Sequence, residues 1–145
     1  QSHPIQRIEL GYLLDGEDLR ALRENSAQFS STSVSIRQGL ENHPQKMELE
    51  DLLTGPMALG TLLEKAGFPA VPSASDTAPA AGDLFFSGGH NTRIHGYRDQ
   101  GMIDAIQLEL NREGLRNESA DRMRFAKRFA NILVEYLEAH YSDVF

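Results

Sequence analysis

Residues 103–110 form a short, mainly apolar run that includes one glutamate, Glu109. Within it, apolar side chains alternate with Gln107 and Glu109, which is the two-residue period of a β-strand. A strand covered on both faces, as in the parallel sheets of α/β proteins, holds a glutamate only where that side chain is paired or functional. The alternative is a half-exposed strand with an ordinary solvated carboxylate. The pattern alone leaves both interpretations open.

A polar loop opened by two glycines precedes this strand. It contains Gly88 and Gly89, which allow the backbone to approach a ligand closely, and then Arg93. The guanidinium of Arg93 carries five donors in a planar fork that suits a carboxylate. Its alternative role is a salt bridge to Asp99 or Asp104.

Three more polar residues of the loop, His90, Asn91 and His95, are candidates for substrate binding. Either histidine is able to donate a hydrogen bond to a developing oxyanion or to help bind a metal. A lone loop histidine is more often a solvated hydrogen-bonding residue. The two histidines outside this region, His43 and His140, are expected at the surface.

The spacing of apolar residues, and the positions of prolines, glycines and capping residues, predict the other elements. Strands are expected at residues 5–14, 70–71 and 84–86. Helices are expected at residues 17–23, 48–53 (one or two turns), 56–66 and 119–140. Residues 24–46 are polar and irregular, with the likeliest loop at 30–35, and residues 72–82 are expected as a surface loop or lid. Pro56 suits a first helical position, Gly67 a left-handed cap, and Ser119 the cap of the last helix.

Charge and composition limit the classes of partner that the chain is expected to bind. The chain carries 21 acidic and 14 basic residues, a net charge of −7, and its basic residues are scattered, which argues against a nucleic-acid or anionic-membrane partner. The absence of cysteine removes disulfides and thiolate chemistry. No apolar run approaches the roughly 20 residues of a membrane span, and the compartment stays open.

The glycine loop and the glutamate strand together carry a family resemblance. The pattern Gly88-Gly89-x-x-Thr92-Arg93-x-x-Gly96, followed by Ile106-Gln107-Leu108-Glu109-Leu110-Asn111-Arg112, resembles the N-formylglutamate amidohydrolase family. Segments 4–14, 59–63 and 67–73 are similar to the C-terminal half of that family. A more distant likeness joins Ser87-Gly88-Gly89, Gln100-Gly101 and Glu109-Leu110-Asn111 to the zinc carboxypeptidases.

The resemblance implies an α/β fold with a mixed, largely parallel sheet flanked by helices, similar to zinc exopeptidases and other phosphorylase/hydrolase-like proteins. Residues 1–145 would form a single domain or only the C-terminal part of the full catalytic domain. The implied function is metal-dependent hydrolysis of an amide, by a deacylase or deformylase of an acidic N-acyl amino acid. Glu109 would then activate the metal-bound water, and Arg93 would hold the substrate carboxylate.

The metal ligands of these families have no counterpart here. The sequence contains no His-x-x-Glu pair, and His3 corresponds to a position just after a ligand. The resemblance therefore implies a divalent metal, zinc first, held by an N-terminal companion chain or segment of the same protein. The rival interpretation is a non-catalytic protein on the same fold that recognises a carboxylate or a sugar.

Overall fold

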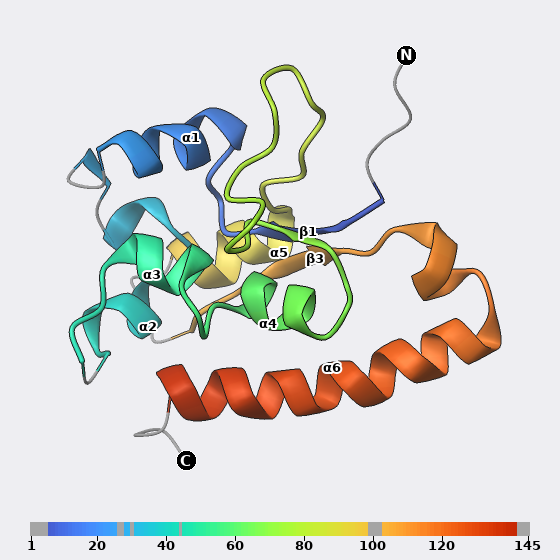
Figure 1. The fold of residues 1–145 in the computed structure, drawn as a ribbon. Coiled ribbons are helices and arrows are strands. Elements are labelled where there is room, and N and C mark those ends of the chain that lie inside the picture. The colour runs from blue at the N-terminus through green and yellow to red at the C-terminus, as the bar shows by residue number, and fades with distance from the viewer. Residues whose placement is uncertain (1–5, 26–27, 30, 44, 99–102, 142–145) are drawn as a thin grey trace.

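The computed structural model describes residues 6–25, 28–29, 31–43, 45–98 and 103–141 (Figure 1). Its centre is a three-stranded sheet in which β1 (Ile8–Gly11) lies between β2 (Ala70–Val71) and β3 (Gln107–Glu109). β1 runs parallel to β2 and antiparallel to β3. The described sheet is mixed, as expected, but one of its two strand pairings is parallel and the other antiparallel, so it is not the largely parallel sheet that the resemblance implies.

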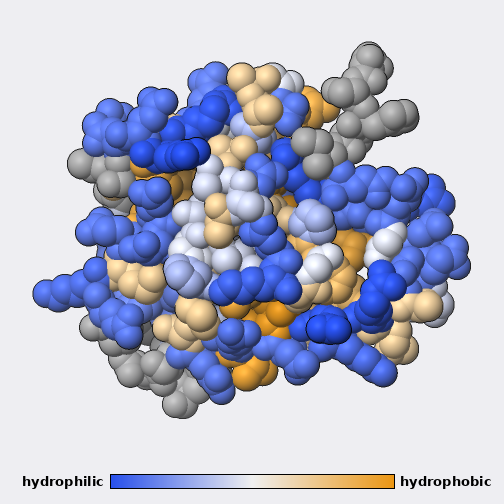
Figure 2. Space-filling model, viewed as in Figure 1, coloured by the Kyte–Doolittle hydropathy of each residue, from blue (hydrophilic) through white to orange (hydrophobic). Residues whose placement is uncertain are grey.

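Helices flank this sheet. They are α1 (Gly16–Glu24), α2 (Arg37–Glu41), α3 (Leu49–Thr54), α4 (Leu59–Lys65), α5 (His90–Arg93) and α6 (Ser119–His140). α6 runs along one side of the molecule and packs against α4 (Figure 1). Hydrophilic side chains cover most of the face in Figure 2, and hydrophobic atoms show mainly where α4 meets α6. None of the described helices has the length and apolar character needed to cross a membrane.

One face of the sheet builds the core. Ile8 and Leu10 of β1 are fully buried, and Leu108 of β3 packs against the same cluster. α4 adds Leu59 and Leu63 to that cluster. α6 adds the residues of its apolar stripe that are buried, namely Phe125, Ile132 and Tyr136. The opposite face of the sheet is polar and belongs to the candidate site.

The first strand is shorter than predicted. Ile8, Leu10, Tyr12 and Leu14 are buried as predicted, but Arg7 and Gly11 on the other side are buried as well, and the strand itself ends at Gly11. Leu13 has a φ of 69°, in the left-handed region that non-glycine residues rarely adopt, so the chain turns there. Residue 5 lies outside the described residues.

Several helices lie where they were predicted, but some of their first residues and N-caps differ from the prediction. α1 and α6 lie where the periodicity places them. α4 begins at Leu59, so Pro56 precedes the helix, and Gly67 takes the expected left-handed φ of 89°. Ser119 is already inside α6, and Glu118, at the N-cap, makes no side-chain cap bond. Asp15 caps α1 through a capping box with Asp18.

Two segments differ from expectation for tertiary reasons. Residues 84–86 form no strand, because no described strand pairs with them: Phe85 packs against the core and Phe86 N donates to the Glu9 side chain, but Leu84 is 95% exposed. α2 forms within a region expected to be irregular. The carboxylate of Asp104 accepts the backbone N–H groups of Gln38 (2.8 Å) and Gly39 (2.6 Å), so its cap comes from a distant part of the chain.

The two histidines expected at the surface are buried, and that prediction is wrong. His43 is 4% exposed and His140 is 3% exposed. Their rings hydrogen-bond to each other, His43 Nε2 to His140 Nδ1 at 3.1 Å. Burial is tolerated because the remaining ring nitrogens also find partners, in Met57 O and Gln45 N.

Candidate functional site

The polar face of the sheet brings two carboxylates together. Glu9 lies directly opposite Glu109 in the antiparallel pairing of β1 and β3, and Gly11 lies opposite Gln107. Residues paired in this way have Cβ atoms about 4.5–5.5 Å apart. Glu109 is exposed, and its Oε1 accepts a hydrogen bond from Gln107 Nε2 at 3.2 Å. Within the described residues, Glu109 is therefore oriented by one partner and open to solvent.

The glycine loop lies against this strand. Thr92, at the start of the predicted Thr-Arg pair, is 3% exposed, and its Oγ1 lies 3.5 Å from Gln107 Oε1. A Cβ placed on Gly89 would meet that same Gln107 oxygen at 3.4 Å. Thr92, Gln107 and Glu109 thus form a line of polar contacts from the loop to the carboxylate.

The approach to the loop crosses β1 at very short range. Leu13 N donates to Ser87 O at 2.7 Å, and Phe86 N donates to Glu9 Oε2 at 2.9 Å. A Cβ on Gly11 would lie 2.6 Å from the backbone N of Gly88. Only a glycine in β1 permits this crossing, which fixes the start of the loop over the sheet.

The segment expected as a surface loop or lid, residues 72–82, is anchored. The buried guanidinium of Arg7 bonds Asp76 at 2.9 Å and lies 3.7 Å from Asp83. Arg20 Nη1 donates to Pro79 O at 2.7 Å. Arg7 and Glu9 do not pair with each other, since each binds this segment or its continuation instead.

The polar candidates for substrate binding lie on α5 and on the π-helical segment that follows it, Ile94–Arg98, and the candidate glycines Gly88 and Gly89 come directly before α5. Helix therefore replaces the expected loop. His90, Asn91, Arg93 and His95 are all exposed.

The Arg93 guanidinium makes no hydrogen bond or ion pair to any described residue. Its predicted alternative partner Asp104 is occupied by α2 and by Tyr141 Oη at 2.7 Å. Asp99 lies outside the described residues.

Of the two residues that link the loop to Glu109, the sequence indicates Gln107 but not Thr92. Gln107 lies two residues before Glu109 in the same strand, so the sequence predicts that both side chains lie on one face of the sheet. Thr92 has no comparable signal, because its burial follows from how α5 packs on β3. The only sequence feature that assigns Glu9 to this site is its position on the polar side of its strand.

The described residues do not form a metal centre. In the part of the chain that the structure describes, no three histidine, aspartate or glutamate side chains lie close enough to hold one ion. Zinc sites need three or four such ligands, so the described face does not fit a zinc ion by itself. His3 lies outside the described residues.

Comparisons with known proteins return no relative. No protein-family model matches the chain, and no curated protein and no solved structure matches it.

Proposed function

We propose that this chain supplies the general base and the carboxylate-binding residue of an amide hydrolase that acts on acidic N-acyl amino acids, within a zinc-exopeptidase-like fold. The observation that supports this most is the position of Glu109. It is exposed on the polar face of the sheet and is linked through Gln107 to Thr92, the neighbour of Arg93.

Glu109 is the residue that we propose as the proton shuttle. In amide hydrolysis a water oxygen adds to the carbonyl carbon, and the C–N bond then breaks. The proposed role of Glu109 is to accept a proton from the attacking water and to pass it to the leaving nitrogen. The bond from Gln107 holds one carboxylate oxygen at 3.2 Å, and the other Glu109 oxygen has no partner among the described residues.

Arg93 is the proposed contact for the substrate carboxylate. Its guanidinium is exposed and unpaired within the described residues, and Arg93 directly follows Thr92, which belongs to the line of polar contacts to Glu109. A planar guanidinium binds a carboxylate through two parallel hydrogen bonds, which favours an acidic substrate over a neutral one.

The proposal includes an N-terminal companion chain or segment that carries the divalent metal, with zinc first. Two features of the described chain support it. β3 lies at an edge of the described sheet, and an unpaired strand edge accepts a further strand. Leu84, Phe86 and Ile103 are 95%, 40% and 59% exposed, which leaves apolar surface for a partner to cover.

Arg93→Ala is expected to weaken the binding of an N-acylated glutamate by the complete protein about 10- to 150-fold. The reason is the loss of a hydrogen-bonded charge pair, which contributes about 1.5–3 kcal/mol. The binding of the matching diamide, which has no carboxylate, should change far less. Calorimetric titration of both ligands measures the difference.

Arg23→Ala on α1 is the matched control, because Arg23 is also exposed and is remote in sequence from the site. An equal loss of affinity for the acid and the diamide would contradict the role of Arg93. A protein that binds without hydrolysing would show the Arg93 effect and no turnover in the unmodified form.

A further inference from the structure

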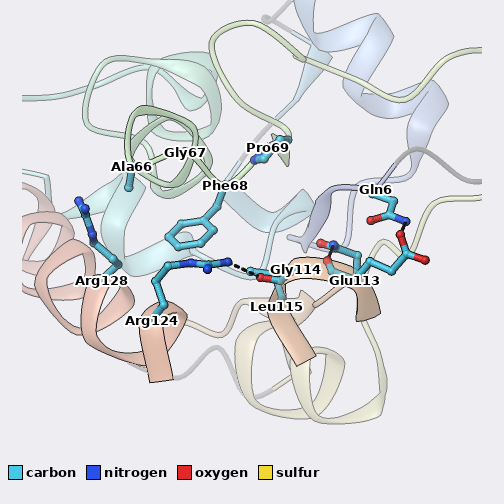
Figure 3. Close-up of a pocket in the computed structure, with 11 residues that line it drawn as sticks. Gln6, Ala66, Gly67, Phe68, Pro69, Glu113, Gly114, Leu115, Arg124 and Arg128 are labelled. Atoms are coloured by element: carbon cyan, nitrogen blue, oxygen red, sulfur yellow. Dashed lines mark hydrogen bonds between the residues drawn. The ribbon is translucent and has the colours of Figure 1, made fainter. Parts of the chain in front are cut away.

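A second candidate site lies beyond the end of β3, on the side of α6. Here a cavity of about 420 Å³ opens between the end of α4, the turn after β3 and the first half of α6 (Figure 3). It is lined by Gln6, Ala66, Gly67, Phe68, Pro69, Asn111, Glu113, Gly114, Leu115, Arg124 and Arg128. This volume falls within the range of about 300–1,000 Å³ of small-molecule sites. Neither Glu109 nor Arg93 lines the cavity.

The cavity lies in a basic part of an acidic protein. Residues 112–128 carry six of the 14 basic residues and only three of the 21 acidic ones, although the net charge of the chain is −7. Two of these basic residues, Arg124 and Arg128, line the cavity from successive turns of α6. Like charges spaced by four residues on a helix repel each other, so this pair does not stabilise the helix. An anion between them would remove the repulsion.

The two guanidiniums differ in how they are held. Arg124 Nη2 donates to Gly114 O at 2.9 Å and bonds Asp121 at 3.0 Å, so this side chain is fixed beneath the Phe68 ring (Figure 3). The Arg128 guanidinium has no hydrogen bond or ion pair to any described residue, and it extends on the Ala66 side of the cavity (Figure 3). Arg124 is therefore held in place by the protein, and the guanidinium of Arg128 is available to bind a ligand.

One part of the cavity wall is apolar, within a lining that is otherwise mainly polar. Phe68 is 7% exposed and packs edge-to-face on Phe125, with ring centroids 5.1 Å apart. Leu115 is 5% exposed beside it. The acidic residue of the rim, Glu113, already accepts a hydrogen bond from Gln6, and both lie on the side away from Arg128 (Figure 3).

We propose that this cavity binds a small organic carboxylate with an apolar body. Arg128 and Arg124 hold the carboxylate, because the guanidinium fork matches its two oxygens, and the Phe68 wall packs against the body. The site is separate from the one at Glu109, and its ligand need not be a substrate. Inorganic phosphate shares the anionic chemistry and lacks the apolar body.

Titration of the ¹⁵N-labelled 145-residue chain at fixed ionic strength tests this proposal, with benzoate, its neutral isostere benzamide and inorganic phosphate as probes. Benzoate should give saturable shifts at the amides of Gly67, Phe68 and Gly114, with a Kd on the order of 1 mM for so small a ligand. Benzamide and phosphate should each bind about tenfold more weakly. Absence of saturation by benzoate would overturn the proposal, and binding of phosphate as tight as that of benzoate would overturn the organic class.

A pair of variants distinguishes binding within the cavity from a general effect of the positive charge on α6. Arg128→Gln should weaken benzoate binding about tenfold or more, because a charged hydrogen-bond partner is lost. Lys127→Gln removes the same charge from the adjacent exposed position outside the cavity, and should leave the Kd within about twofold. An equal loss in both variants would show that benzoate responds only to the net charge of α6.

Discussion

Replacing Glu109 with Gln is expected to lower the turnover of the complete protein by about 10²–10⁴-fold. The substitution keeps the shape of the side chain and its contact with Gln107, and it removes the group that accepts the proton. Substrate affinity and metal content should stay close to those of the unmodified protein, because Glu109 is assigned to proton transfer alone. Steady-state kinetics with an N-acylated glutamate, combined with metal analysis, measure all three quantities.

The control for this variant is Glu138→Gln, which makes the same change at an exposed position near the end of α6. Its turnover should match that of the unmodified protein. Near-normal turnover of Glu109→Gln would remove Glu109 from the mechanism, and a loss of metal in that variant would assign it to the metal site instead.

The second large effect concerns the buried pair of histidines, whose protonation states are set by geometry. His140 Nε2 lies 3.0 Å from the carbonyl of Met57, which only accepts, so that nitrogen carries a proton. His140 Nδ1 then accepts from His43 Nε2 at 3.1 Å, and His43 Nδ1 accepts from Gln45 N at 3.2 Å. Both rings are neutral in this arrangement, and a further proton would face another N–H group.

This arrangement joins the end of α6 to two other segments and makes the fold sensitive to acid. Burial, followed by the positive charge that His43 would carry, lowers the pKa of His140 below 6.5, although the bond to Met57 opposes the shift. The unfolded chain therefore binds more protons than the folded chain at and below pH 6.5. The stability from His140 is complete above about pH 6.5 and is lost as the pH falls below it. Tyr136, which packs on His140, stays uncharged because burial raises its pKa to about 12.

His140→Leu is expected to lower the free energy of unfolding by about 2–5 kcal/mol at pH 7.5, because it leaves the Met57 carbonyl and His43 Nε2 unpaired. The gap between the variant and the unmodified chain should narrow between pH 6.5 and 5, at up to about 1.4 kcal/mol per pH unit. Urea denaturation at a series of pH values measures it. His95→Leu, at an exposed position, should change stability by less than about 0.5 kcal/mol. A gap that is constant with pH would contradict the neutral pairing.

Local patterns predicted much of the fold. The helical stripe that places α6 and the alternation around Ile8 and Leu10 both depend on residues close in sequence, and the structure confirms both. Gly67 was predictable for the same reason, since only glycine takes a φ of 89° without strain. These features follow from the spacing of apolar residues and from the backbone conformations that each residue type allows, and both can be read from a single sequence.

Features that depend on distant partners were not predictable. α2 is capped by Asp104, and His43 is buried because His140 satisfies its ring from the other end of the chain. The strand expected at residues 84–86 does not form because a short apolar segment does not by itself provide a neighbouring strand. For the candidate site, the sequence places Arg93 near Glu109 only through a resemblance. The Thr92–Gln107 contact that joins the two segments depends on packing.

The proposed function requires that the polar face around Glu109 is half of a hydrolase site and that a companion completes this site. Native mass spectrometry of the protein from its natural source, with and without denaturant, tests it most directly. We expect a species that contains residues 1–145 together with an N-terminal companion, as a second chain or as part of a longer one, and that binds a stoichiometric divalent metal. A monodisperse, metal-free species with the mass of the 145-residue chain alone would contradict the claim.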